Sequence, residues 1–257
     1  MWEKERAIAE QASRAAGKIL NRLFGRVNHI IKKGHIDLVT EADLQAEKCI
    51  LEIIHANFPQ DNILSEESGM SEEVSDRTWL VDPLDGTTNF AHGFPFFAIS
   101  IALEFEKQIV LGIVYNPRMD EYFEAVKGRG ASMNGKPIQT SQTANLIESL
   151  LATGFPYDVQ EKPLRVMERF TKMIVRAQGV RRPGSAAIDL CYVAAGRFDG
   201  FWEEGLKPWD TAAGTVIVNE AGGKVTTYEG EAYSPYQKSI VATNPYIHDA
   251  VIKGLQG

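Results

Sequence analysis

Two aspartates, Asp82 and Asp85, follow a short apolar run and are separated only by Pro83 and Leu84. Carboxylates this close repel each other unless a positive charge lies between them. A divalent cation would supply that charge, and ligation by oxygen alone favours Mg²⁺, Mn²⁺ or Ca²⁺ over zinc. The turn between them also exposes the carbonyl of Leu84 as a further oxygen ligand. The plainer alternative is a surface turn, because Asp-Pro and Asp-Gly pairs are common there.

Gly86 and Thr87 come next in the chain. Glycine permits a strained backbone and the close approach of a ligand. If these residues open a helix, their backbone N–H groups point at an anion. Carboxylates beside an anion site would oppose phosphate binding, and metal ions resolve that opposition. The segment therefore predicts a phosphate held through metal ions.

Further acidic residues are needed for such a site, and the sequence has three groups of them. Glu66 and Glu67 follow an expected strand, Asp210 precedes a strongly apolar helical segment, and Asp37 and Asp43 flank the start of another helix. Each group has a simpler interpretation. The glutamates suit a solvated loop, and the aspartates suit helix caps.

Apolar spacing and capping residues predict the elements that position these acids. We expect helices over residues 1–24, from Thr40 through 54, and over 164–175, 186–195, 211–221 and 246–255. Strands are expected over 62–65, 79–82, 97–105, 109–115, 122–126, 150–153, 224–226 and 239–242, with a turn at 134–137. The result is a layered α/β (α+β) protein. We expect one domain over 1–257, with a possible division into a strand-rich half, 1–142, and an alternating half, 143–257.

Composition excludes several classes of protein. The chain has 257 residues, of which 44% are hydrophobic, so it can bury a large core without a disulfide or metal. Its 27 basic and 34 acidic side chains give a net charge of −7, which argues against a broad surface for nucleic acid or anionic lipid. Neither a signal peptide nor a membrane span is evident, so we expect a cytoplasmic protein with no direct nucleic-acid or membrane partner.

Taken together, these segments resemble the inositol monophosphatase family of Mg²⁺-dependent, lithium-sensitive phosphatases. The segment Asp-Pro-Leu-Asp-Gly-Thr-Thr-Asn-Phe at 82–90 matches the first family signature, and 209–214 with 220–223 matches the second. Residues 66–68 and 37–40 supply the other blocks in the expected order. Segments 181–187 and 204–210 are most similar to the bacterial SuhB-type members.

The resemblance implies a layered αβαβα sandwich of the inositol monophosphatase and fructose-1,6-bisphosphatase type, in a homodimer, with two or three Mg²⁺ ions per site. Its first ion would be held by Glu66, Asp82 and the carbonyl of Leu84, and its second by Asp82, Asp85 and Asp210. Glu66 would help to place a third through water.

The resemblance also implies the residues that meet the substrate. Gly86 and Thr87 would bind the phosphate, and Thr87 with Asp43 would orient and deprotonate the attacking water, with Glu66 assisting through its metal. The residues expected to contact the substrate's alcohol part are Arg181, Gly184, Ser185, Ala186 and Glu203, with Asp210 also facing the substrate.

The expected reaction is hydrolysis of a phosphate monoester, inositol 1-phosphate, by metal-activated water. Fructose-1,6-bisphosphatase or dual sugar phosphatase activity is the first alternative. A nucleotide substrate is disfavoured because Thr88 and Asn89, rather than Lys-Glu, follow the Asp-Gly-Thr segment. A second alternative is regulatory binding to the transcription machinery, for which Arg176, Arg181 and Arg182 would form a basic patch.

Overall fold

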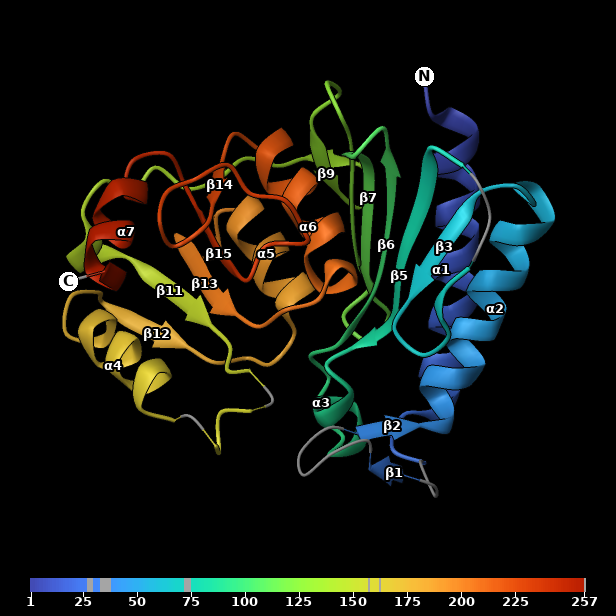
Figure 1. Cartoon of the computed structure of the whole chain (residues 1–257), viewed down its shortest axis with the longest axis horizontal. Helices are drawn as coiled ribbons and strands as arrows, with labels where there is room; N and C mark the ends of the chain where they lie inside the picture. The colour runs from blue at the N-terminus through green and yellow to red at the C-terminus, as the bar shows by residue number, and fades with distance from the viewer. Residues whose placement is uncertain (27–29, 33–37, 72–74, 157, 162, 257) are drawn as a thin grey trace.

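The computed structural model describes residues 1–26, 30–32, 38–71, 75–156, 158–161 and 163–256. They form five layers that alternate helices and sheets, as the resemblance implied (Figure 1). Helices α1 (Glu3–Leu23) and α2 (Glu41–Asn57) cover one face of the larger sheet, and helices α5 (Ala186–Ala194) and α6 (Pro208–Glu220) fill the space between the two sheets. Helices α4 (Pro163–Ile174) and α7 (His248–Gln256) cover the outer face of the smaller sheet.

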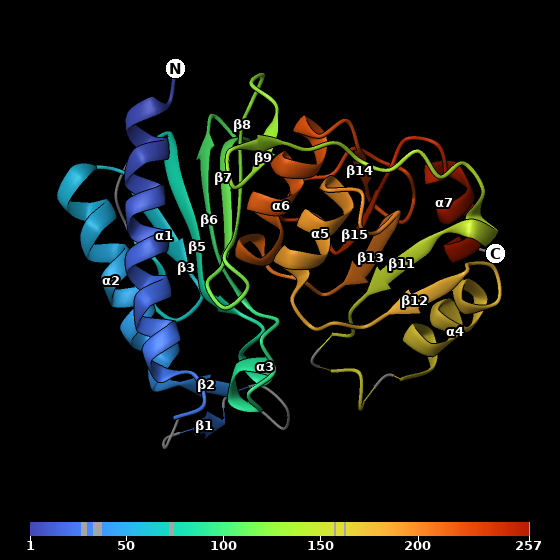
Figure 2. The ribbon, with the colours of Figure 1, turned by 180° about the vertical axis from the view of Figure 1, so that it is seen from behind.

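The first layer is an antiparallel pair of helices, α1 (Glu3–Leu23) and α2 (Glu41–Asn57). Figure 2 shows them side by side on the outer face of the larger sheet. Small buried residues such as Ala9, Ala12 and Ala16 let α1 lie close to its neighbours. Helix α2 begins with the predicted cap: Thr40 Oγ1 accepts from Ala42 N at 3.1 Å, and Asp43 Oδ2 accepts from Thr40 N at 2.8 Å. The cap fixes Asp43 at the start of α2.

The larger sheet has eight strands in the order β10-β9-β8-β7-β6-β5-β3-β4. They are β3 (Asn62–Ser65), β4 (Gly69–Met70), β5 (Arg77–Asp85), β6 (Ala98–Phe105), β7 (Gln108–Asn116), β8 (Glu121–Val126), β9 (Ala131–Met133) and β10 (Lys136–Pro137). Strand β5 pairs Asp82 with Ser100 and Asp85 with Ala98 of β6, and the register shifts between these pairs. The bulged strand bends there, so both aspartates lie where β5 leaves the sheet.

The helices of the central layer pack very close to the larger sheet and to each other. A Cβ on Gly112 of β7 would be 2.6 Å from the carbonyl oxygen of Ala213 in α6 (Pro208–Glu220). A Cβ on Gly214 would be 2.6 Å from Leu190 Cβ in α5 (Ala186–Ala194). These helices are apolar on nearly all sides because they are buried between two sheets.

The smaller sheet has five strands in the order β12-β11-β13-β15-β14. They are β11 (Leu150–Thr153), β12 (Gly179–Arg181), β13 (Gly200–Glu204), β14 (Lys224–Thr226) and β15 (Ser239–Thr243), and the helices outside them are α4 (Pro163–Ile174) and α7 (His248–Gln256). Strand β11 runs parallel to β12 and β13. One apolar cluster fills each outer gap, and a third spans the central helices and both sheets.

Each predicted helix and strand is present, with ends shifted by a few residues. The sequence analysis did not anticipate the short pair β1 (Ile30–Lys32) and β2 (Leu38–Thr40), the short helix η1 (Leu146–Glu148), or β4, β12 and β13. Of the expected turn at 134–137, residues 134–135 form the tip of the β9–β10 hairpin and 136–137 form β10, and neither strand of this hairpin was anticipated. The division at 142 stays a prediction, although α5 and α6 from the second half share a core with the first sheet. Among the described helices, none is long and apolar enough to cross a membrane.

Candidate active site

A cavity of about 550 Å³ lies beyond the end of β5, where helices α3 (Thr87–Ala91), α5 and α6 begin and β13 ends. Figure 1 shows α3 directly below the end of β5. The predicted site residues that line this cavity are Glu66, Asp82, Leu84, Asp85, Gly86, Thr87, Gly184, Ser185, Ala186, Glu203 and Asp210. Segments far apart in the sequence therefore meet at one place.

Each of the three aspartates predicted as metal ligands accepts hydrogen bonds from the protein through one of its carboxylate oxygens. Asp82 Oδ1 accepts from Leu84 N at 2.9 Å, and Asp210 Oδ2 accepts from Lys207 N at 2.7 Å. Asp85 Oδ2 accepts from Ser185 Oγ at 2.6 Å and from Ala187 N at 2.7 Å. Asp85 therefore joins the end of β5 to the start of α5, and Ser185 both caps α5 and orients this carboxylate.

Burial and mutual repulsion change the ionisation of these groups. Burial raises the pKa of Asp82 well above its usual range, and repulsion from Glu66, Asp85 and Asp210 raises it further. Burial raises the pKa of Asp85 to about 6, although hydrogen bonds from Ser185 and Ala187 oppose the shift. Burial and repulsion from Asp85 raise the pKa of Asp210. The cavity therefore has an excess of negative charge when these groups ionise.

Thr87 and Asp43 form a second buried arrangement. Thr87 Oγ1 lies 3.0 Å from Asp43 Oδ1 and 3.0 Å from the carbonyl oxygen of Leu84. Asp43 also accepts from Thr40 Oγ1 at 2.6 Å. Burial raises the pKa of Asp43 to about 6, so this carboxylate can accept a proton near neutral pH.

Glu66 follows β3, and its backbone N donates to the carbonyl of Val81 at 3.2 Å. Glu67 does not belong to the lining, and its backbone N donates to Glu47 Oε2 of α2 at 3.0 Å. Glu47 also accepts from Ser68 Oγ. This glutamate, which the sequence analysis did not single out, anchors the loop that carries Glu66. Asp37 lies outside the described residues.

The structure places Arg182, not Arg181, in the cavity lining. Arg181 is exposed, and its guanidinium turns back to the carbonyl of Val180 at 3.3 Å and over Gly179. Successive side chains of an extended strand point to opposite sides, so only one of two neighbouring arginines at the end of β12 faces the cavity. The guanidinium of Arg182 lies 5.6 Å from the ring centre of Phe155.

Glu203 lies at the end of β13 and is 7% exposed. Its carboxylate lies directly against Gly154, where an added Cβ would be 2.0 Å from Oε2. Burial raises the pKa of Glu203 to about 8, opposed by the charge of Arg182. Asp189 of α5 also lines the cavity, although the sequence analysis did not identify it. Its position four residues after Ser185 places it on the same helix face, which was an available signal.

The donor set of this cavity fits a hard divalent cation. It consists of carboxylates and a backbone carbonyl, which are the ligands that Mg²⁺ prefers, and a cation would offset the repulsion described above. Within the residues that the structure describes, no group of three His, Cys, Asp or Glu side chains is arranged to hold a metal ion as it stands.

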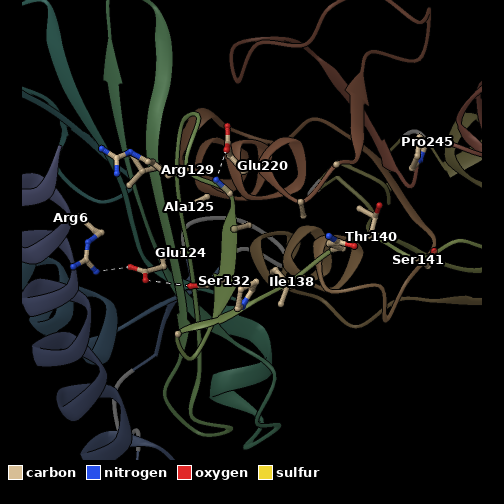
Figure 3. Close-up of a pocket in the computed structure, with 18 of the residues that line it drawn as sticks. Arg6, Glu124, Ala125, Arg129, Ser132, Ile138, Thr140, Ser141, Glu220 and Pro245 are labelled. Atoms are coloured by element: carbon tan, nitrogen blue, oxygen red, sulfur yellow. Dashed lines mark hydrogen bonds and ion pairs between the residues drawn. The ribbon is translucent and has the colours of Figure 1, made fainter. Parts of the chain in front are cut away.

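A second hollow, of about 640 Å³, lies between β8–β10 and the end of α6 (Figure 3). Three of its charged side chains, Arg6, Glu124 and Glu220, have protein partners. Arg6 Nη1 lies 3.0 Å from Glu124 Oε2, and Glu220 accepts from the backbone N–H groups of Gly128 and Gly130 at 2.8 Å each. This hollow lacks the repelling carboxylates of the first cavity, so the chemistry is assigned to the first.

The model of the inositol monophosphatase family matches residues 1–256. The chain is 48% identical over 250 residues to the inositol-1-monophosphatase of Synechocystis sp., covering 96% of this chain and 87% of that protein. It is 40% identical over 252 residues to the Nus factor SuhB of Escherichia coli, covering 97% and 94%.

Solved structures of inositol monophosphatases and SuhB proteins are similar to this fold. The extragenic suppressor protein SuhB from Bartonella henselae superposes with a TM-score of 0.93 at 42% identity, covering 97% of each chain. Inositol monophosphatase from Anabaena superposes with a TM-score of 0.91 at 42% identity, covering 99% of this chain and 96% of that one.

Proposed function

The chain belongs to the inositol monophosphatase family, and from this membership we propose that it is a Mg²⁺-dependent phosphatase that hydrolyses inositol 1-phosphate to inositol and phosphate. The observation that carries the proposal is the cavity where Asp82, Asp85 and Asp210 meet with raised pKa values. Such a set of acids repels a phosphate monoester unless cations are bound.

The proposed cation ligands are those that the family resemblance implied. Glu66, Asp82 and the Leu84 carbonyl would hold one ion, and Asp82, Asp85 and Asp210 a second, while Glu66 would help to place a third through water. When bound, divalent ions neutralise the phosphate and lower the pKa of water. The hydroxyl of Ser185 keeps the Asp85 carboxylate in orientation, and the backbone N–H of Lys207 does the same for Asp210.

The chain's own groups would then position the phosphate and remove a proton. Backbone N–H groups of Gly86 and Thr87 would bind phosphate oxygens. Thr87 Oγ1 donates its proton to Asp43, so its lone pairs would accept a hydrogen bond from the attacking water. As the water passes a proton to Thr87 Oγ1, Asp43, with its pKa near 6, would take up the Thr87 hydroxyl proton.

The alcohol part of the substrate would lie between the start of α5 and the end of β13. Gly184, Ser185, Ala186 and Glu203 would line this part, with Asp210 beside it. We assign the nearby positive charge to Arg182 rather than to Arg181, because Arg182 is the arginine that lines the cavity. A homodimer in the cytoplasm and sensitivity to lithium are further parts of the proposal.

One relative favours a second candidate function. The Escherichia coli protein that is 40% identical to this chain is named Nus factor SuhB, so we also propose binding to the transcription machinery. Arg176 and Arg181 are exposed and would supply basic contacts. A pulldown of transcription proteins by the Asp82→Asn variant, equal to that by the wild type, is the expected result. Loss of the pulldown in Arg176→Ala/Arg181→Ala would locate the surface, and no capture by the wild type would contradict this function.

The main proposal is tested by phosphate release from inositol 1-phosphate and from fructose 1,6-bisphosphate, each with Mg²⁺ and with chelator. We expect Mg²⁺-dependent release that favours inositol 1-phosphate, and less than about a tenth of that rate in Asp82→Asn. Preference for fructose 1,6-bisphosphate would replace the proposed substrate with the alternative. No release from either substrate by folded protein would contradict the enzyme assignment.

A further inference from the structure

Asp189 is the most unusual acidic residue of the cavity. It lies in the first turns of α5, is 1% exposed, and its Oδ1 makes no hydrogen bond with any residue that the structure describes. Buried carboxylate oxygens are almost always hydrogen-bonded, because leaving one without a donor costs free energy. An oxygen in this position is therefore suited to a donor that the protein itself does not supply.

The position of Asp189 indicates where that donor comes from. Asp189 lies one helical turn after Ser185 and Ala186, and all three line the cavity. Glu203 lines the same cavity from β13. The charge of Asp189 is repelled by Glu203 and Asp85 and attracted by Arg182. Asp189 and Glu203 therefore line the region left for the alcohol together with the Arg182 guanidinium.

We propose that Asp189 is a specificity-determining residue that accepts a hydrogen bond from a hydroxyl group of the substrate's alcohol. The inference rests on the proposed phosphatase function and names a determinant of its substrate class. With Glu203, Asp189 forms a pair of acceptors that matches a polyol, whose hydroxyls donate protons. A phosphate ester without these hydroxyls leaves Asp189 Oδ1 unpaired, and a site with an unpaired buried polar atom discriminates strongly against such a substrate.

The test compares two phosphate esters in Asp189→Ala and Asp189→Asn. Inositol 1-phosphate carries the alcohol hydroxyls, whereas p-nitrophenyl phosphate has none. With saturating Mg²⁺, we expect Asp189→Ala to lower kcat/KM for inositol 1-phosphate by at least about tenfold, chiefly through KM. For p-nitrophenyl phosphate, we expect a change of less than about threefold. Asp189→Asn keeps an acceptor oxygen and should lose less.

The unfolding temperature of each variant shows whether a loss of activity comes from lost substrate recognition or from a destabilised fold. Because Asp189 Oδ1 has no donor within the described chain, Asp189→Asn should unfold at the wild-type temperature or above it. Cys191→Ala is the matched control, since Cys191 is buried two residues further along α5 in the central core. It should leave the ratio of the two activities unchanged.

Two results would overturn the inference: equal losses on both esters with a lowered unfolding temperature, or wild-type kinetics on both esters. Calorimetric binding of inositol 1-phosphate gives the same comparison without turnover. If the wild type hydrolyses neither ester, the proposed function fails. Wild-type binding of inositol 1-phosphate that Asp189→Ala weakens would still support the assignment of Asp189, and equal binding would remove it.

Discussion

Thr87 has one hydroxyl proton but two acceptors at 3.0 Å, Asp43 Oδ1 and the Leu84 carbonyl. It can donate to only one of them at a time. When Thr87 donates to Asp43, it connects this proposed base to the place where the attacking water would lie. We therefore expect Thr87→Ala to lower kcat by about 100-fold, while Thr87→Ser, which keeps the hydroxyl, retains a large part of the activity.

Steady-state kinetics with a Mg²⁺ titration provide the measurement for Thr87. The Mg²⁺ concentration at half-maximal rate should change by less than about threefold in Thr87→Ala, because no proposed metal ligand is removed. A parallel loss of rate and of metal affinity, or equal rates for the Ala and Ser variants, would show that Thr87 is structural.

At the residue scale, the sequence predicted most acids of the cavity but neither Asp189 nor all of the residues that contact them. Asp82, Asp85 and Asp210 stand in segments that resemble the family signatures, whereas spacing by itself left a surface turn or a helix cap open for them. Arg182 could not be distinguished from Arg181, because this choice depends on the direction in which β12 enters the site. Glu47 and Gly154 act through contacts between distant segments, which no local pattern contains.

The elements beneath the site depend on close backbone packing between β7 and α6. A Cβ on Gly112 would lie 2.6 Å from the Ala213 carbonyl and from Val216 Cγ1. Backbone atoms cannot move aside as a flexible side-chain end does. We expect Gly112→Ala to lower the free energy of unfolding by about 1–3 kcal/mol, measured by urea denaturation.

Asp210 begins α6, so movement of this helix also affects the site. Gly112→Ala should therefore weaken activation by Mg²⁺, whereas Gly230→Ala is a control at a surface turn with nothing within 4 Å of the added Cβ. The control can lose stability through its positive φ but should activate normally. Normal stability of Gly112→Ala would show that β7 and α6 separate easily.

At the element scale, long apolar segments were predicted well and short ones were not. Helices α5 and α6 are apolar on nearly all sides, and their burial between two sheets explains this pattern. Strand β13 was not predicted because its sequence, Gly-Phe-Trp-Glu-Glu, ends in two acids and lacks alternation. Each acid has a role at the end of this strand. Glu203 lines the cavity, and Glu204 forms ion pairs with Arg165 and Arg169.

The whole molecule buries several carboxyl groups whose charge Arg182 offsets only in part, and bound cations would offset more of it. Burial raises the pKa of Asp43 and Asp85 to about 6 and that of Glu203 to about 8. Each folded-state pKa exceeds its unfolded value, so the folded chain binds protons more tightly. The resulting stability is present at low pH and is lost as pH rises from about 4 to about 8.

We therefore expect the contribution of these groups to make the chelated protein less stable at about pH 8 than at about pH 5.5. Since Mg²⁺ binds ionised carboxylates and only the folded chain gathers them, its stabilising effect should be larger at the higher pH. Urea denaturation with Mg²⁺ and with chelator at both pH values measures this. Glu203→Gln should reduce the loss of stability with pH but keep the Mg²⁺ effect, because Glu203 is not a proposed ligand. If Mg²⁺ stabilised the protein equally at both pH values, its binding would not depend on the ionisation of these carboxylates.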